Sequence, residues 1–189
     1  MRGLRCVSVL VAALLLPAVA FGQSPGISPE SREKLDALLM AYEHRPTAEE
    51  FLALGDGVRD ALIGIAQNAD ELALVRGRAV TALVYYPDDV SRRCIESLLE
   101  RPELSDIIVR PAIAALAQAF AGSAVTRITP YLDDERSAVR EEAARALGDI
   151  GTPAALRALR RRLDREGEDV VRGALESAIR RIETTVTAE

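Results

Sequence analysis

The chain has 189 residues, of which 49% are hydrophobic and only 4% aromatic, and its formal net charge at pH 7 is -5. This length is sufficient for one domain with a continuous hydrophobic core. The acidic balance argues against nucleic-acid binding, because affinity for nucleic acids comes mainly from cations that neutralise phosphates.

The first 22 residues have the pattern of a secretory signal peptide. Arg2 and Arg5 give a basic start, and residues 7–20 form an apolar run that ends in the small side chains that signal peptidase accepts. We expect cleavage after Ala20 or after Gly22, and a periplasmic or secreted protein. An uncleaved anchor is the alternative, but the run is shorter than the roughly 20 residues that a spanning helix needs. No membrane insertion is expected after removal of the signal.

Export changes the charge and the cysteine content of the mature chain. Loss of Arg2 and Arg5 lowers the basic count from 24 to 22 against 29 acidic residues, a formal charge near -7. Cys6 leaves with the signal, so Cys94 remains alone and no internal disulfide is possible. We expect Cys94 to be a buried, unreactive side chain. The alternative is a disulfide between two chains.

Residues 23–30 and 31–55 precede the main part of the chain. The first segment is rich in serine, glycine and proline and predicts a flexible linker. The second predicts two helices that cap the structure. Thr47 and Glu50 have the spacing of a capping box, and four residues of the first helix share one apolar face: Leu35, Leu38, Leu39 and Tyr42.

Residues 56–183 contain a repeat. The pair Val-Arg recurs with steps of 34, 30 and 32 residues, beginning at Val75, Val109, Val139 and Val171. Positions four, seven, eight and eleven after each valine are apolar in all four copies, and these offsets lie on one stripe of an α-helix. The sixteen residues of this stripe are Ala79, Ala82, Leu83, Tyr86, Ile113, Leu116, Ala117, Phe120, Ala143, Ala146, Leu147, Ile150, Leu175, Ala178, Ile179 and Ile182.

Shorter apolar-periodic stretches lie between these four helices and complete each unit as a helical hairpin. Thr152 followed by Pro153 predicts a helix start, and Ser105 and Asp134 could cap two of the long helices. Pro130 should kink or end the short helix of the third unit. Because a period of this length is typical of stacked units, the sequence predicts an all-α protein, an α-solenoid. Residues 184–189 form a polar tail.

Residues 132–156 resemble the consensus of a HEAT repeat, in the short bacterial form similar to the repeats of phycobilisome lyases. The resemblance covers about residues 56–183, with one strong unit and three weaker ones. It implies a superhelix of about four HEAT-like hairpins. It also implies a ladder in which an acid pairs with the arginine six positions later, and which Leu104 should interrupt. The expected pairs are Asp70 with Arg76, Asp134 with Arg140, and Glu166 with Arg172.

Candidate catalytic groups are scarce. His44 is the single histidine, so a histidine metal cluster is excluded and a lone general base is a weak candidate beside a solvated residue at a helix end. The pairs Asp88-Asp89 and Asp133-Asp134 lie at turns between helices, where acids cap helix ends. We therefore predict no catalytic residue, no metal site and no cofactor. Arg157, Arg160 and Arg161 form a basic helix face, which is solvated or meets an acidic partner.

The HEAT resemblance implies that the second helix of each hairpin lines the concave side of the stack. Variable positions outside the apolar stripe are then the natural contact residues. Tyr85 lies ten residues after the valine of the first copy, and the other copies have small or charged residues at that position. An exposed tyrosine there would be an interface anchor. The alternative is that Tyr85 packs against the neighbouring first unit. The predicted protein-binding residues are Arg78, Thr81, Tyr85, Glu142, Arg145 and Asp149.

These features predict an exported, non-catalytic protein-interaction module, a scaffold or adaptor of the periplasm or cell envelope whose partner is another protein. One alternative is a lyase-like or chaperone-like HEAT protein that acts on a tetrapyrrole or a client protein. A second is DNA binding, which needs a basic concave face. Glu141, Glu142 and Asp149 argue against it.

Overall fold

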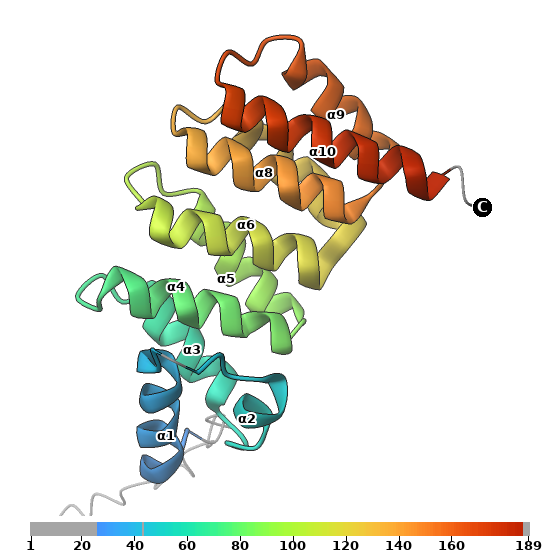
Figure 1. Ribbon diagram of the computed structural model, residues 1–189. Helices are drawn as coiled ribbons and strands as arrows, with labels where there is room; N and C mark the ends of the chain where they lie inside the picture. Colours follow the sequence, from blue (N-terminus) through green and yellow to red (C-terminus); the bar gives the residue numbers. More distant parts are fainter. Residues whose placement is uncertain (1–25, 43, 187–189) are drawn as a thin grey trace, which may run out of the picture.

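The computed structural model describes residues 26–42 and 44–186, without the side chain of Val186. The expected signal peptide and the first part of the expected linker lie outside the described residues. The described residues form α-helices and short 3₁₀ turns, with no strand among them (Figure 1). The all-α prediction is therefore confirmed.

Two helices cap the N-terminal end of the fold. Helix α1, Pro29–Met40, begins after Ser28, whose side chain accepts a hydrogen bond from the Ser31 backbone at 3.1 Å. Helix α2, Ala48–Leu52, starts with the expected capping box. The Thr47 hydroxyl accepts from the backbone N–H of Glu50, and the Glu50 carboxylate accepts from the backbone N–H of Thr47.

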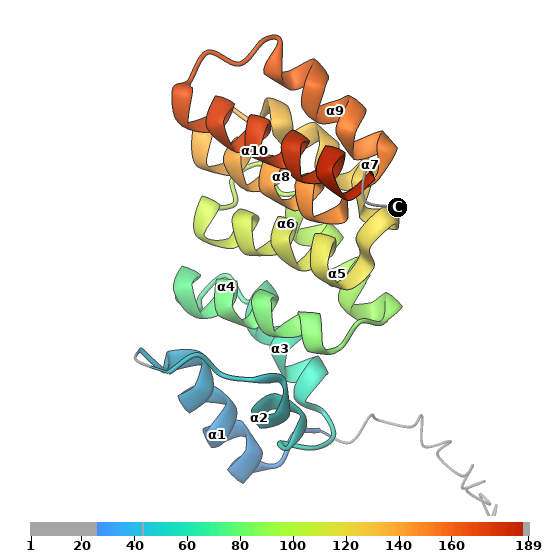
Figure 2. The same cartoon turned by 45° about the vertical axis from the view of Figure 1, so that its right-hand side comes forward.

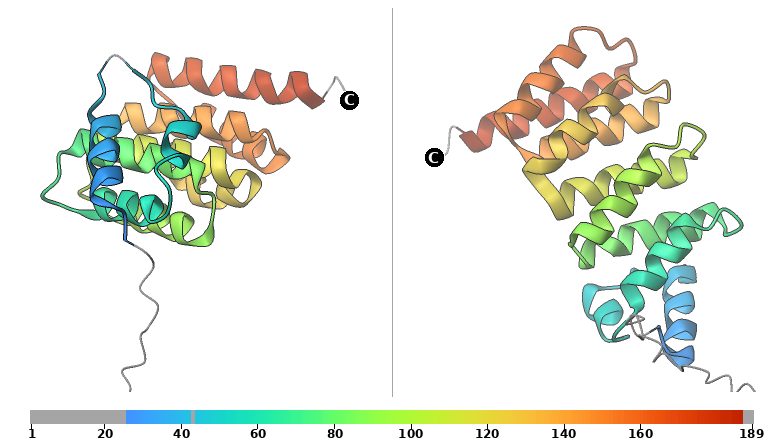
Figure 3. Two further views of the ribbon diagram at one scale, coloured as in Figure 1. Left: turned by 90° about the horizontal axis from the view of Figure 1, so that it is seen from below. Right: turned by 180° about the vertical axis from the view of Figure 1, so that it is seen from behind.

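Four helical hairpins follow the cap and stack on one another. The second helices of the hairpins form one layer, and the first helices lie behind them (Figures 1 and 2); the view from behind shows this second layer directly (Figure 3). The pairs are α3 (Val58–Gln67) with α4 (Ala73–Ala82), α5 (Asp89–Leu99) with α6 (Asp106–Phe120), α7 (Val125–Ile128) with α8 (Ser137–Ile150), and α9 (Pro153–Leu163) with α10 (Asp169–Val186).

The third hairpin has an irregular first half. Helix α7 is a single turn between two 3₁₀ segments, η2 at Ala121–Ala124 and η3 at Thr129–Asp133. Pro130 lies at the start of η3, where its missing N–H ends the α-helical hydrogen bonding as expected. The N-caps predicted at Ser105 and Thr152 are confirmed, because their side chains cap α6 and α9. The N-cap of α8, however, is Arg136 and not Asp134.

The apolar stripe forms the core of the stack. Twelve of its sixteen residues are buried, and the other four, Tyr86, Ala117, Phe120 and Ile150, are half-buried and pack against that core. Neighbouring hairpins thus bury one another's apolar faces, as the repeat requires. This confirms the α-solenoid.

Small residues allow the second helices to approach closely. A Cβ on Gly77 would lie 2.5 Å from the carbonyl oxygen of Ile107 in α6. In a regular α-helix the backbone N–H of residue 111 would donate to this carbonyl, but Pro111 has no N–H. The carbonyl of Ile107 therefore lacks its usual helical partner at the point where Gly77 packs. A Cβ on Gly148 would lie 2.6 Å from the Cβ of Ala178 in α10. Both glycines therefore set the spacing between neighbouring units.

Residues 106–133 are long and apolar enough to span a membrane by length and composition alone. In the structure this stretch is divided among α6, η2, α7 and η3. Ile108, Ile113 and Leu116 of α6 are buried in the core of the stack, where α6 packs between α4 and α8. The arrangement is that of a core helix.

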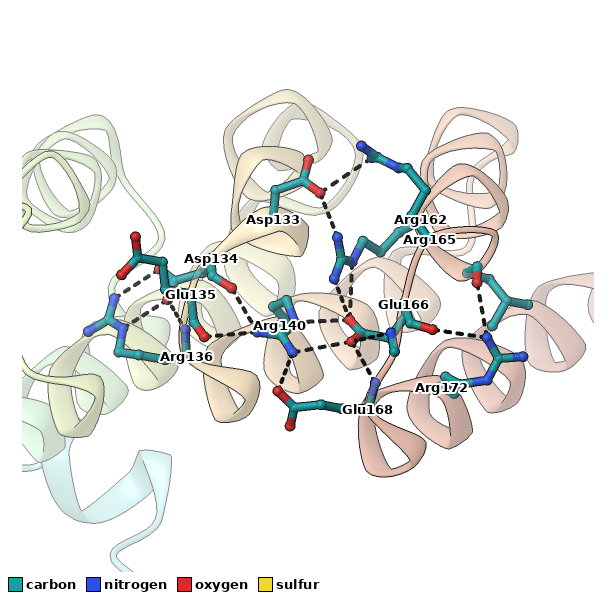
Figure 4. Close-up of polar contacts among 12 residues, drawn as sticks. Asp133, Asp134, Glu135, Arg136, Arg140, Arg162, Arg165, Glu166, Glu168 and Arg172 are labelled. Atoms are coloured by element: carbon teal, nitrogen blue, oxygen red, sulfur yellow. Dashed lines mark hydrogen bonds and ion pairs between the residues drawn. The ribbon is translucent and has the colours of Figure 1, made fainter.

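A network of arginines and acids joins the third unit to the fourth (Figure 4). Arg140, which is buried, donates to both carboxylate oxygens of Glu166, at 2.9 and 3.2 Å. It also donates to the backbone carbonyls of Asp134 and Glu135 at 2.9 and 3.0 Å. Arg162 also belongs to the network, and its guanidinium donates to a carboxylate oxygen of Glu166 at 2.6 Å.

The predicted ladder, which was to join neighbouring units, is therefore wrong in its acid–arginine pairs. The acid six positions before the arginine contributes its backbone carbonyl, as Asp134 does to Arg140 and Glu166 does to Arg172. Arg76 instead donates to the carbonyl of Ala66 at 3.1 Å. Arg76, Arg140 and Arg172 close their own hairpin turns through backbone oxygens. Among the described residues, Arg140 also reaches the carboxylate of Glu166 in the next unit, and Arg110 of the second unit lies 3.7 Å from the carboxylate of Glu142 in the third.

Candidate functional site

A hollow of about 460 Å³ lies between the N-terminal cap and the first hairpin. Three segments form its walls: the end of α1 with the loop that follows it, Phe51 of α2, and the exposed side of α4 with its 3₁₀ extension η1, Leu83–Tyr85. Its lining residues are Leu38, Leu39, Ala41, Tyr42, His44, Arg45, Pro46, Phe51, Arg78, Thr81, Ala82 and Tyr85. Three of the predicted protein-binding residues are among them.

These three residues take their places from α4. The Arg78 guanidinium donates to the carbonyl of Leu39 at 2.7 Å and so ties α4 to α1. Thr81 is exposed one turn later, and its hydroxyl donates to the carbonyl of Gly77. Because the chain tightens into η1 after Ala82, Tyr85 turns toward the cap. Its ring centroid lies 5.7 Å from that of Phe51.

The loop after α1 forms the outer wall of the hollow. His44 Nε2 lies 2.8 Å from a carboxylate oxygen of Glu50. The backbone N–H of Thr47 and the His44 contact hold the pKa of Glu50 below its usual value. Tyr42 and Arg45 are exposed at the mouth of the hollow, and Tyr42 retains 94% of its accessible surface. Tyr42 was expected on the apolar face of the first helix, but α1 ends at Met40.

The other three predicted residues lie elsewhere. Arg145 donates to Glu142 at 2.9 Å and to Glu141 at 2.7 Å, and Asp149 is paired with Arg181 of the next unit. Arg145 and Arg181 line a separate hollow of about 220 Å³ between α8 and α10.

The six residues therefore do not form one continuous open face. Helix α6 separates the two groups, and at the corresponding positions it carries Ala112 and Ala115, which are buried. Thr81, Arg145 and Asp149 are exposed, whereas Arg78, Tyr85 and Glu142 are partly buried. Their role in binding a partner stays a prediction.

The loop between α1 and α2 contributes residues to this site that were not predicted from the sequence. Tyr42, His44, Arg45 and Pro46 line the hollow, but none was predicted to bind a partner. A proline and three polar or aromatic residues directly after a short helix are the available signal. Their position beside α4 depends on how the cap packs, which periodicity does not specify.

Groups able to hold a metal are not brought together in the described part of the chain. Residues 26–42 and 44–186 contain no cluster of three or more His, Cys, Asp or Glu side chains placed to bind a metal ion. Burial raises the pKa of Cys94 to about 11, which keeps its thiol protonated at neutral pH.

Comparison with known proteins supports the fold assignment. The family model for HEAT repeats matches residues 95–180, which run from within α5 to within α10 and include the strongest repeat. This chain is a HEAT-repeat protein. The match leaves the cap and the first hairpin outside, and the structure extends the same hairpin stacking to α3 and α4.

Two similar proteins carry the same name. The HEAT-repeat chain is 45% identical over 71 residues to deoxyhypusine hydroxylase of Chaetomium globosum, a match that covers 36% of this chain and 21% of that protein. It also resembles the solved structure of human deoxyhypusine hydroxylase in complex with glycerol, with a TM-score of 0.57 and 27% identity. That likeness covers 67% of this chain and 43% of the human chain.

These relatives overturn part of the functional prediction. Deoxyhypusine hydroxylase is an enzyme, so the expectation of a non-catalytic scaffold is contradicted. The expected export stays a prediction. The comparison does not support the lyase-like or chaperone-like alternative either. The HEAT-repeat chain spans about a fifth of the fungal relative and less than half of the human one.

Proposed function

We propose that this HEAT-repeat chain belongs to an enzyme of the deoxyhypusine hydroxylase kind, and that it binds a polypeptide in the hollow between the cap and α4. The kinship with two hydroxylases supports the enzymatic setting. The hollow itself is the observation that carries the binding role.

The chemistry of the lining suggests what kind of segment the hollow takes. Tyr42, Phe51 and Tyr85 supply aromatic surface, which is enriched at binding sites because one ring gives a large contact area. Arg45 and Arg78 add positive charge, and no acidic side chain is among the lining residues. A segment with an apolar side chain next to a carboxylate suits these walls.

Peptide selection followed by calorimetry tests this proposal. Peptides selected from a displayed library on the purified chain should combine apolar and acidic residues. Tyr42→Ser and Arg45→Glu should each weaken binding of such a peptide about tenfold or more, as loss of an interface anchor does. Both side chains are exposed and Tyr42 is not part of the buried core, so folding should be retained.

A matched control is Arg157→Glu. Arg157 is exposed on α9, at the opposite end of the stack from the cap. Equal weakening by all three variants, or none by the two variants of the hollow, would contradict the proposed site. The enzymatic setting is tested by mass spectrometry of the polypeptide recovered with the chain. It should carry an added oxygen atom, and the same polypeptide from cells lacking the chain should not.

We also propose export of the chain to the periplasm or the exterior. The support is the basic start and apolar run of the first 22 residues. Mass spectrometry of the protein from a cell expressing the full sequence should give a mature chain that begins after Ala20 or after Gly22. An intact N-terminus in the cytoplasmic fraction would refute this.

A further inference from the structure

The turns within the four hairpins lie along one edge of the stack. Figure 1 shows them on the same side, where each first helix leads into its second helix. The N-terminal ends of α4, α6, α8 and α10 therefore follow one another along this edge. We call it the turn edge; it comprises residues 68–74, 100–107, 133–138 and 164–170.

Large apolar side chains are exposed along the turn edge. Leu72 and Leu74 at the start of α4 retain 63% and 54% of their surface, Ile107 of α6 retains 49%, and Val170 of α10 retains 69%. They are half of the eight large hydrophobic side chains that are exposed in the described part of the chain. They lie at the starts of α4, α6 and α10, and the start of α8 has none, so three of the four turns carry such a side chain; we call these four residues the row.

The surface is hollowed between the second and third turns. A depression of about 630 Å³ lies there, with Leu104 and Tyr131 in its walls. Its charged lining residues are four acids and two arginines: Glu103, Asp106, Asp134, Glu135, Arg101 and Arg136. Ile107 of the row directly follows the lining residue Asp106, so this concave surface adjoins the row at the second turn.

Acidic side chains flank this row at every turn. Asp70, Glu103, Glu135 and Asp169 are exposed, and none of these four forms an ion pair with the described residues. The arginines of the same turns are mostly occupied, because Arg136 pairs with Asp134 and Arg165 pairs with Asp133. The turn edge therefore has exposed apolar side chains with acidic side chains around them.

We propose that the turn edge docks an extended polypeptide in which apolar residues alternate with lysine or arginine. Packed helices lie about 8–10 Å apart, and a chain in the extended polyproline II conformation advances about 3.1 Å per residue with three residues per turn, so every third side chain points to the same side. Apolar residues at about every third position would therefore meet α4 and α6, and another one two steps further along would meet α10. The basic residues between them would face the acids of the turns. This surface is independent of the hollow at the cap.

Fluorescence anisotropy with synthetic peptides tests the proposal on the full-length protein. The probe is a labelled peptide of about ten residues with leucine at every third position and lysine between; the comparison peptide has glutamate in place of lysine. The lysine peptide should bind, and its affinity should fall with added salt because exposed charges are screened. The glutamate peptide should not bind. Equal binding of both peptides would overturn the proposal.

Variants locate the binding. Val170→Lys and Glu103→Lys should each weaken binding of the lysine peptide about tenfold, whereas Val90→Lys on α5 and Tyr42→Ser at the cap should leave it unchanged. Val90 is a matched control, because it is also an exposed valine near a helix start. Equal loss with the control variants would overturn the proposal. So would concentration-dependent self-association that Val170→Lys abolishes, since the occupant would then be a second copy of the chain.

Discussion

Glu166 shows how one residue can join two units of the stack. Its burial is the largest effect on its pKa and acts to raise it, but hydrogen bonds from Arg140, the Glu168 backbone and Arg162 together lower the pKa from 4.5 to about 2. A carboxylate with three such donors is held in its ionised form. Glu166 is therefore a charged carboxylate in the folded protein.

This pKa predicts a pH-dependent contribution to stability. The lowered pKa means that the contribution is complete above about pH 4.5 and is lost as the pH falls toward 2, and its size is about 3 kcal/mol. Glu166→Gln should therefore lower the free energy of unfolding at pH 7 by about that amount, and the difference from the unchanged protein should shrink at pH 3.

Urea unfolding at the two pH values measures this difference. The control is Glu168→Gln, because Glu168 also contacts Arg140 but its side chain is 58% exposed. An exposed pair contributes about 0–1 kcal/mol, so the control should have a much smaller effect. Equal losses for both variants would show that burial of the pair does not determine its contribution.

Cys94 gives a second prediction at this scale. Its side chain is 5% exposed and its pKa is raised to about 11, which supports the expectation of an unreactive residue rather than a bridge between chains. The native protein should therefore fail to react with a thiol reagent at pH 8 and should react with one equivalent in urea. Rapid labelling of the folded chain would contradict the burial of Cys94.

At the scale of helices, close packing of α8 and α10 depends on Gly148. A methyl group there would meet Ala178 at 2.6 Å, so Gly148→Ala should force the two helices apart. Such overpacking costs about 1–3 kcal/mol. Thermal unfolding should show a clear fall in the midpoint.

Gly173→Ala is the matched control in the neighbouring helix. Gly173 is exposed in α10 and a Cβ there would meet nothing within 4 Å. Alanine favours a helix interior over glycine by about 0.5–1 kcal/mol, so this variant should be slightly more stable. Similar destabilisation by both substitutions would argue against the close approach of α8 and α10.

Helices and their ends were the most predictable part of the fold. The offsets of the apolar stripe depend only on helical geometry, and Ser105 and Thr152 cap through contacts within their own helix start. Asp134 was assigned wrongly, because its carboxylate accepts from Arg136 two positions later and is occupied before α8 begins. A helix N-cap is therefore predicted wrongly where a nearby arginine binds the carboxylate that would otherwise cap the helix.

Contacts between units were predicted less well. Arg140 reaches forward to Glu166 across 26 residues, and that direction depends on how far apart the hairpins stack. The candidate site shows the same limit. Arg78, Thr81 and Tyr85 come together, but Ala112 and Ala115 close the surface of α6 between them and the residues of α8. A repeat alignment gives equivalent positions and not their exposure.

At the scale of the whole molecule, a stack of four hairpins ends in a cap whose loop forms one side of a hollow. Hydrogen exchange with and without a selected peptide tests this account most directly, because binding should slow exchange where backbone becomes ordered. The account predicts added protection in residues 38–42, 44–46 and 78–85, with the helices of the last two hairpins unchanged. Protection confined to α8–α10, or none at a saturating peptide concentration, would contradict it.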